Sequence, residues 1–123
     1  MLSILIDSNI ILDVMITRLP FFEMSNKVTE AVKLKKVEGY VSASSVTDIY
    51  YIARRELKNK EAAFNLIKDM LQSIKIAAVS QNEINNALEL EWNDFEDAVQ
   101  YSTALLNNMD YIITRNVDDF ESI

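Results

Sequence analysis

Short apolar runs alternate along this chain with longer segments in which apolar residues recur every three or four positions. The short runs cover residues 2–6, 40–41, 74–79 and 111–114, and they predict buried strands. The segments with helical periodicity cover roughly residues 21–37, 45–57, 59–71, 81–91 and 94–107. Strands that alternate with helices predict an α/β domain with a mostly parallel sheet covered on both faces.

The length and composition fit one compact domain. The chain has 123 residues, and half of them are apolar, so a single core can form without disulfides. One glycine, Gly39, and one proline, Pro20, leave no linker-like stretch and exclude the glycine-rich phosphate loops of nucleotide-binding folds. No apolar run reaches the length of a membrane span, and the first strand lacks the flanks of a signal peptide. We therefore expect a cytoplasmic protein with no membrane partner.

The residue types restrict the chemistry. The chain has neither cysteine nor histidine, which excludes thiol nucleophiles, histidine bases and zinc fingers. A net charge of −7 argues against a nucleic-acid partner unless a bound cation offsets it. Basic residues do gather in two places and could guide RNA, although such runs are more often solvated helix faces. They are Lys33, Lys35 and Lys36, and then Arg54, Arg55, Lys58 and Lys60.

Acidic residues stand at four positions relative to the predicted elements. Asp7 follows the first strand and Asp48 the second, Asp94 and Asp97 open a helix, and Asp118 and Asp119 follow the last strand. Parallel strands all end at one edge of a sheet, and the helices that return the chain begin there. The sequence therefore predicts that these carboxylates converge at the carboxyl edge.

Two helical segments separate the third and fourth predicted strands, although the chain must return across the sheet only once. Residues 94–107 lead directly into the last strand, so this segment should be the one that returns. Residues 81–91 should then lie across the end of the sheet. This arrangement also brings the start of the 94–107 helix to the carboxyl edge.

Gathered carboxylates need a counter-charge. Two like charges about 4 Å apart cost about 4 kcal/mol at an effective dielectric constant of about 20, which is a large part of the stability of a typical domain. Hard oxygen ligands without histidine or thiolate select Mg²⁺ or Mn²⁺ over zinc. Such a metal could hold a phosphate and activate a bound water, which amounts to hydrolysis of a phosphodiester.

Each acid also has an ordinary structural explanation. Asp7 could cap the helix that follows it, and residues 45–48 match a capping box that would explain Asp48. Asp94 and Asp97 in a first turn are favoured by the helix dipole, and Asp118 and Asp119 could be loop acids. These explanations account poorly for four such positions at one edge.

Four segments together carry a resemblance that covers nearly the whole chain. They are residues 7–13 (DSNIILD), 45–51 (SVTDIYY), 94–98 (DFEDA) and 110–120 (DYIITRNVDDF), and they resemble a PIN domain of the bacterial VapC-like toxin group. The resemblance implies a three-layer α/β/α sandwich with a mostly parallel central sheet and a Mg²⁺- or Mn²⁺-dependent endoribonuclease. It also implies the toxin of a type II toxin–antitoxin pair, with a cognate antitoxin and a homodimer.

Carried over to this chain, the resemblance assigns the metal to Asp7, Asp97 and Asp119, and it makes Asp48 a fourth catalytic acid where many members have glutamate. The acidic position after the last strand, which the resemblance assigns to Asp119, could also be filled by Asn116 or Asp118. Supporting residues would then orient the carboxylates or the phosphate, with Arg115 or a second metal helping the leaving group. The supporting residues are Ser8, Asn9, Asp94, Thr114, Arg115, Asn116 and Asp118.

Several alternatives stay open. A catalytically inactive PIN-like domain that binds a partner would have the same fold but little affinity for metal. Two other classes are disfavoured. A response-regulator receiver needs an acidic pair after the first strand and an aspartate at the end of the third, where residues 77–80 have none, and a haloacid dehalogenase phosphatase needs an aspartate where Asn9 stands. Tyr50 and Tyr51 could stack on RNA bases, although aromatic residues on a helix are more often core. Family members usually continue into a final short strand, so a chain that stops at Ile123 is expected to leave a sheet edge open.

Overall fold

The computed structural model describes residues 1–115. The strands are β1 (Ser3–Ile6), β2 (Glu38–Ser42), β3 (Lys75–Ala77) and β4 (Tyr111–Ile113). The helices are α1 (Ser8–Met15), α2 (Phe22–Lys33), α3 (Ala43–Leu57), α4 (Lys60–Met70), α5 (Gln81–Leu90) and α6 (Phe95–Leu106). None of the helices in these residues has the length and apolar character needed to cross a bilayer.

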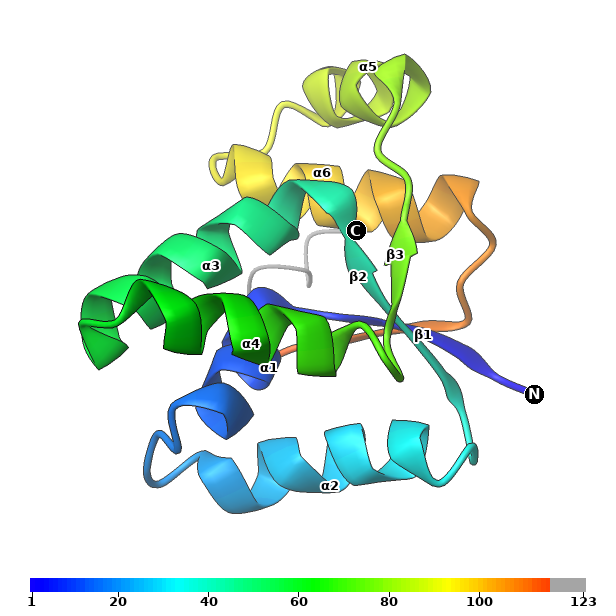
Figure 1. Ribbon diagram of the computed structural model, residues 1–123. Coiled ribbons are helices and arrows are strands. Elements are labelled where there is room, and N and C mark those ends of the chain that lie inside the picture. The colour runs from blue at the N-terminus through cyan, green and yellow to red at the C-terminus, as the bar shows by residue number, and fades with distance from the viewer. Residues whose placement is uncertain (116–123) are drawn as a thin grey trace.

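The four strands form one sheet in the order β3-β2-β1-β4. All three pairings between the described strands are parallel, and Leu5 at the centre of β1 is level with Tyr40 of β2 and Ile112 of β4. The sequence-based prediction of a mostly parallel sheet is therefore confirmed. The carboxyl ends of the strands meet at one edge, from which α1 and α3 depart (Figure 1).

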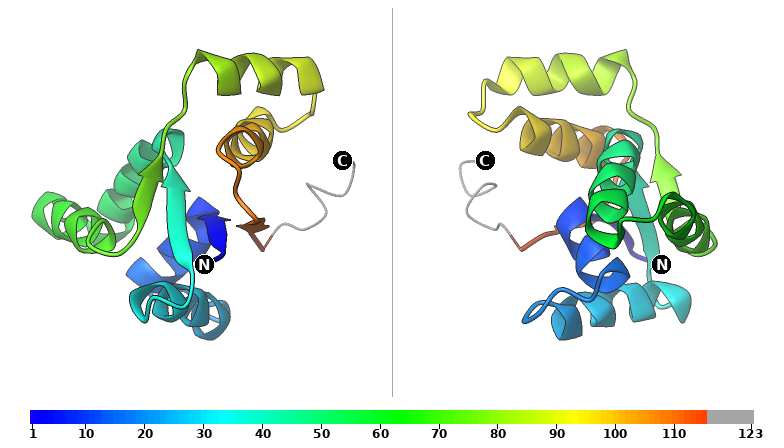
Figure 2. Two further views of the ribbon diagram at one scale, coloured as in Figure 1. Left: turned by 90° about the vertical axis from the view of Figure 1, so that its right-hand side faces the viewer. Right: turned by 60° about the vertical axis from the view of Figure 1, so that its left-hand side comes forward.

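The alternation of side chains along β1 divides the core into two layers. Ile4 and Ile6 pack with residues of α1, α2, α3 and α4, whereas Leu5 points to the opposite face and packs with Ala104 of α6. Figure 2 shows the same division, with the first four helices on one side of the sheet and α6 on the other. The three-layer α/β/α sandwich expected from the sequence is confirmed.

Of the two helices between β3 and β4, only α6 packs on the sheet, as the sequence predicts. Helix α6 contacts β1 and β4, whereas α5 packs on α6 through a small cluster around Ala87, Ala98 and Val99. Figure 1 shows α5 beyond the carboxyl end of the sheet. The start of α6 consequently lies at the same edge as the end of β1.

The element boundaries differ from the predicted ones in a few places. The helix that was expected to follow Asp7 is α1, with eight residues, although this stretch was not among the segments with helical periodicity. The third strand spans three residues instead of the predicted 74–79, because an edge strand pairs on one side only and Ile76 is half exposed. Gly39 lies under α2, where a Cβ atom would come 2.6 Å from Cγ2 of Val32.

Candidate active site

Asp7 is the centre of the candidate site. It follows β1 directly, and its side chain is 5% exposed. Its Oδ1 accepts hydrogen bonds from Nε2 of Gln100 at 3.0 Å and from Oγ of Ser8 at 3.4 Å, and its Oδ2 accepts one from Oγ1 of Thr114 at 2.9 Å. These donors come from α6, α1 and the end of β4, so three separate parts of the chain converge on one carboxylate.

The side chain of Asp7 does not cap helix α1. Asp7 is the N-cap residue of α1 by its backbone, yet its carboxylate makes no capping hydrogen bond to that helix. All three donors to the carboxylate are neutral, and no Lys or Arg within residues 1–115 forms an ion pair with it. Asp7 is thus a buried carboxylate that is oriented by its neighbours but not neutralised by them.

The start of α6 brings two further acids to this edge. Asp94 is the N-cap residue, and its Oδ1 accepts a hydrogen bond of 3.1 Å from the backbone N–H of Asp97. Asp94 therefore does cap its helix, as the ordinary explanation requires. Asp97 is buried in the first turn, and Gln100, which holds Asp7, lies one turn further along the same side of α6. The helix thus presents Asp97 and Gln100 toward the region of Asp7.

Glu96 belongs to the same acidic group, although the sequence analysis did not select it. Burial raises its pKa above the usual value of 4.5, and the negative charges of Asp48, Asp94 and Asp7 raise it further. The carboxylates of Asp7 after β1, Asp48 on α3 and Asp94 before α6 thus all act on Glu96. The available signal in the sequence was its place between Asp94 and Asp97 in an acidic first turn.

Asp48 is near this group, but the capping box predicted for residues 45–48 is wrong. Helix α3 begins at Ala43 with Ser42 as its N-cap residue, so Asp48 lies in the second turn. The Oγ of Ser45 is buried and lies 2.8 Å from Oγ of Ser42 instead of capping the helix. The helix starts earlier because the strand ends in a run of small residues that can turn directly into it. Asp48 is exposed and has no role in starting the helix.

The supporting residues named from the sequence lie in different surroundings. Ser8 and Thr114 both contact the carboxylate of Asp7. Asn9 instead accepts hydrogen bonds from Nη2 of Arg18, through its backbone oxygen at 3.0 Å and its side-chain Oδ1 at 3.2 Å. Asn116, Asp118 and Asp119 lie outside the described residues.

Arg115 forms an ion pair with Asp13, which the sequence did not indicate as a functional residue. The carboxylate of Asp13 is fully buried, and it lies 3.0 Å from Nε of Arg18 and 3.0 Å from Nε of Arg115. It also accepts a hydrogen bond of 2.7 Å from Oγ of Ser25. The guanidinium of Arg115 stacks 3.8 Å from the ring centre of Phe21. This cluster joins α1, α2 and the end of β4, so it holds Thr114 beside Asp7.

The carboxylate oxygens at this edge are the type of ligand that a hard divalent cation prefers, although the described residues do not form a complete metal cage. Within residues 1–115, no group of three or more acidic side chains is arranged to hold a metal ion. Asp7 is a buried carboxylate with neutral donors, and the pKa of Glu96 is raised first by burial and then by the negative charges of its neighbours. Mg²⁺ keeps several water ligands and needs few carboxylates, so such a sparse donor set suits it.

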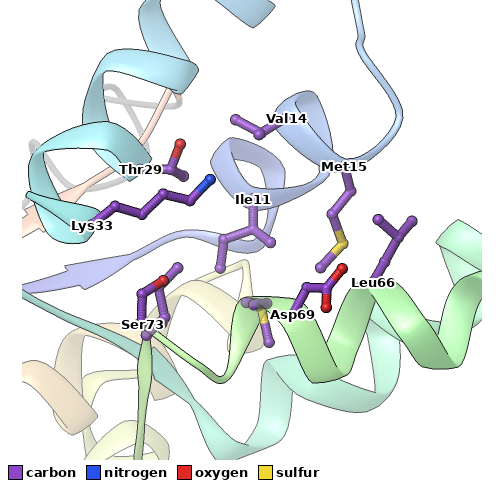
Figure 3. Close-up of a pocket in the computed structure, with 10 residues that line it drawn as sticks. Ile11, Val14, Met15, Thr29, Lys33, Leu66, Asp69 and Ser73 are labelled. Atoms are coloured by element: carbon purple, nitrogen blue, oxygen red, sulfur yellow. The ribbon is translucent and has the colours of Figure 1, made fainter.

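The pocket drawn in Figure 3 lies elsewhere in the molecule. It has a volume of about 230 Å³, lies between α1, α2 and α4, and is mostly apolar. Lys33 and Asp69 are its charged lining residues. None of the residues assigned to the acidic site lines this pocket. It is therefore separate from the candidate active site.

A parallel sheet between helical layers, with acidic residues gathered at its carboxyl edge, defines an α/β protein of the kind that binds its ligands at that edge. The chain belongs to the PIN domain family, because the family model for the PIN domain matches residues 3–118. This match confirms the resemblance carried by the four sequence segments. A comparison with curated protein sequences gave no match.

Solved structures of toxins share this fold. A toxin–antitoxin complex from Klebsiella pneumoniae is 22% identical with a TM-score of 0.73, and the match covers 98% of this chain and 92% of that chain. VapC20 of Mycobacterium tuberculosis, a toxin that cleaves the sarcin-ricin loop, is 11% identical with a TM-score of 0.78, covering 98% and 95%. VapBC2 of Rickettsia felis, bound to a promoter DNA fragment, is 15% identical with a TM-score of 0.70, covering 95% and 90%. At these identities the likeness shows the fold.

Proposed function

We propose that this protein is a Mg²⁺- or Mn²⁺-dependent endoribonuclease and the toxin of a toxin–antitoxin pair. The observation that carries this proposal is the buried carboxylate of Asp7, which Gln100 and Thr114 orient and no described cation neutralises. Membership of the PIN domain family and the likeness to VapC toxins support it. The whole chain, residues 1–123, would act as a single domain.

The assigned metal ligands are Asp7, Asp97 and Asp119. When bound, a divalent cation supplies positive charge that activates water and stabilises the charge developing on phosphate oxygens. Asp7 would hold it with an orientation fixed by hydrogen bonds to both carboxylate oxygens. Asp97 would contribute from the first turn of α6. Asp119, or Asn116 or Asp118 in its place, would complete the set.

Hydrolysis requires a water oxygen to bond to phosphorus while the bridging phosphorus–oxygen bond breaks. The water gives up a proton, and the leaving oxygen takes one up. Asp48 and Glu96 would exchange these protons at the border of the site, and the raised pKa of Glu96 favours its protonated form, which can donate one. Arg115 would act by holding Thr114 in place, since its guanidinium is paired with Asp13.

The substrate would be a single-stranded or looped RNA whose backbone can reach the acidic edge. Beyond Asp48, the exposed side of α3 carries Tyr51, which is 64% exposed and is therefore not a core residue. One turn further along α3, Arg55 lines a pocket of about 330 Å³ together with Glu56 and with Arg18 from the segment after α1. This surface would give a strand leaving the site the ring of Tyr51 to stack on, and Arg55 would turn from Glu56 to a phosphate.

A toxin needs an antitoxin, and we propose a cognate antitoxin protein and a homodimer as the partners of this chain. The support is the likeness to structures described as a toxin–antitoxin complex from Klebsiella pneumoniae and VapBC2 of Rickettsia felis. Among the strands of residues 1–115, β4 stands at one edge of the sheet, and an edge strand favours pairing with another chain.

The second candidate function is a catalytically inactive domain that binds a partner protein. One observation favours it, namely the mostly apolar pocket between α1, α2 and α4, which is separate from the acidic edge (Figure 3). An apolar pocket of this kind is typical of a place where a partner inserts a side chain. This function would leave the oriented carboxylate of Asp7 without a purpose.

The deciding experiment is to incubate total bacterial RNA with the purified protein in Mn²⁺ and to map new RNA ends by sequencing. The proposal expects a small set of new ends that appear with the wild type and disappear with Asp7→Asn or with EDTA. Because such enzymes can be selective, total RNA is a better substrate than one arbitrary transcript. Identical end maps for the wild type and Asp7→Asn would instead favour the partner-binding function.

A further inference from the structure

Gln100 is a buried polar residue of α6, one helical turn beyond Asp97. Its side chain is 2% exposed, and Nε2 donates the 3.0 Å hydrogen bond to Oδ1 of Asp7. The orientation of the amide is fixed by this bond, because a carboxylate can accept but not donate. The other polar atom of the amide, Oε1, is therefore the one that does not face the carboxylate of Asp7.

That oxygen has no protein hydrogen-bond partner within the described residues, although it is fully buried. A buried carbonyl without a donor destabilises the folded protein, so proteins rarely retain one without a bound water or ligand. Oε1 belongs to the same amide that touches Asp7 and therefore lies close to the carboxylate. A water molecule at the acidic site is a donor of suitable size and chemistry.

We propose that Gln100 is a positioning residue with two tasks. Its Nε2 fixes the carboxylate of Asp7, and its Oε1 accepts a hydrogen bond from the water that attacks the phosphodiester. This inference rests on the proposed function and adds a residue to it. An amide is suited to both tasks because it donates and accepts at fixed positions and carries no charge that would repel Asp7.

Thr114 provides the matched comparison. Its Oγ1 donates to the other carboxylate oxygen of Asp7, at 2.9 Å. Thr114→Val removes one orienting bond from Asp7 and leaves Gln100 intact. Gln100→Met keeps the length and volume of the side chain but removes both the donor and the acceptor. A loss of Mn²⁺ affinity or kcat that both variants share is due to the orientation of Asp7. A loss of kcat in Gln100→Met alone is due to the contact of Oε1 with the attacking water.

The experiment measures the Mn²⁺ dissociation constant by titration calorimetry, the melting temperature in EDTA, and turnover of bis(para-nitrophenyl) phosphate at saturating Mn²⁺. Both variants should bind Mn²⁺ about 10- to 100-fold more weakly than the wild type. At saturating Mn²⁺, Gln100→Met should also lose kcat by about tenfold or more, with KM unchanged. Thr114→Val should retain most of its kcat. If Gln100→Met does not fold, Gln100→Asn, whose shorter amide cannot reach both groups, replaces it.

The outcomes separate this inference from the proposed function. Wild-type protein that binds no Mn²⁺ would overturn both. Tight binding and turnover by the wild type, matched by Gln100→Met with an unchanged melting temperature, would overturn the role of Gln100 alone. Equal losses of kcat in Gln100→Met and Thr114→Val would mean that Gln100 orients Asp7 but does not bind the attacking water.

Discussion

Arg115 and Asp13 form an ion pair, with Nε of the arginine 3.0 Å from Oδ2 of the aspartate. Arg115 lies just after β4, and Asp13 lies in the second turn of α1 and is fully buried. Arg18 and Ser25 contact the same carboxylate. The pair therefore fixes the end of the last strand against the first helix, and Thr114 with it.

Removal of the Asp13 carboxylate should destabilise the protein strongly. Asp13→Ala leaves two part-buried arginines without their partner, and a broken buried pair costs about 3–5 kcal/mol. Urea denaturation measures this loss. The exposed pair of Glu30 and Lys33, at 3.7 Å, is the control, and Glu30→Ala should cost less than about 1 kcal/mol. Equal effects of the two substitutions would refute the structural role of Asp13.

Metal binding should stabilise the wild type and not the ligand variants. A ligand at about 100 times its dissociation constant adds about 2.7 kcal/mol to the unfolding free energy. Mn²⁺ should therefore raise the melting temperature of the wild type, and this increase should be absent in Asp7→Asn and Asp97→Asn. In EDTA, Asp7→Asn removes one of the charges that raise the pKa of Glu96, but its amide can accept from only one of Gln100 and Thr114, so the two effects oppose each other and no large change in melting temperature is expected. No response of the wild type to Mn²⁺ would argue against a metal site.

Glu96→Gln should stabilise the metal-free protein at neutral pH. The pKa of Glu96 is raised in the folded protein, so its ionised form opposes folding, and stability falls as pH rises through the folded pKa. The gain from Glu96→Gln is thus present above that pKa and vanishes below about 4.5, where Glu96 is protonated in both states. Because Glu96 is partly exposed, the gain should stay below about 1 kcal/mol.

Melting curves in EDTA from acidic to neutral pH test this dependence. Glu89→Gln, at an exposed position on α5, is the control for the loss of one negative charge. A gain from Glu96→Gln that persists at acidic pH would show that charge repulsion is not its cause.

Glu83→Gln should have the opposite pH dependence. The carboxylate of Glu83 accepts hydrogen bonds from the backbone N–H of Ser80 at 2.6 Å and from its Oγ at 2.5 Å, and these bonds lower its pKa. A lowered carboxyl pKa stabilises the fold above about 4.5, and this stabilisation is lost as pH falls through the folded pKa. The variant should therefore be less stable than the wild type at neutral pH and nearly equal to it at about pH 3. Denaturation at the two pH values measures the difference.

Tyr51→Ala should weaken RNA binding without a loss of stability. A stacked base contributes about 1–3 kcal/mol, which corresponds to about a 5- to 150-fold change in the dissociation constant. Fluorescence anisotropy with a labelled single-stranded RNA in Mn²⁺ measures it. Tyr111, also exposed but on the edge strand β4, is the control. Equal affinities of Tyr51→Ala and Tyr111→Ala would exclude a stacking role for Tyr51.

The arrangement of the fold could be read from the sequence because it depends on local pattern. Apolar runs such as residues 111–114 have the length of buried strands, and the alternation with helical segments leaves few topologies. The boundaries were less certain. The capping box at residues 45–48 was misassigned because the same short polar residues suit both a cap and a first turn. The helix begins at Ala43, and the hydroxyl of Ser45 is taken up by a local contact with Ser42.

The site could be predicted only as a set of acids. The rule that parallel strands end at one edge placed Asp7 and Asp97 together before any contact was known. Gln100 and Asp13 were missed because nothing in the local pattern distinguishes a polar residue that turns inward from one that faces water. The one signal for Gln100 was its place one helical turn after Asp97, on the side of the helix that was expected to face the acidic edge.

The sequence by itself determined the chemistry that is open to this protein and the edge where it takes place. A chain with no cysteine or histidine, many carboxylates and alternating strands and helices has oxygen ligands at a sheet edge and little else. Only the tertiary structure decided which carboxylate is buried, what orients it and which arginine is already paired. Those properties arise between residues about a hundred positions apart, such as Asp7 and Thr114, whose contact exists only once the sheet has formed.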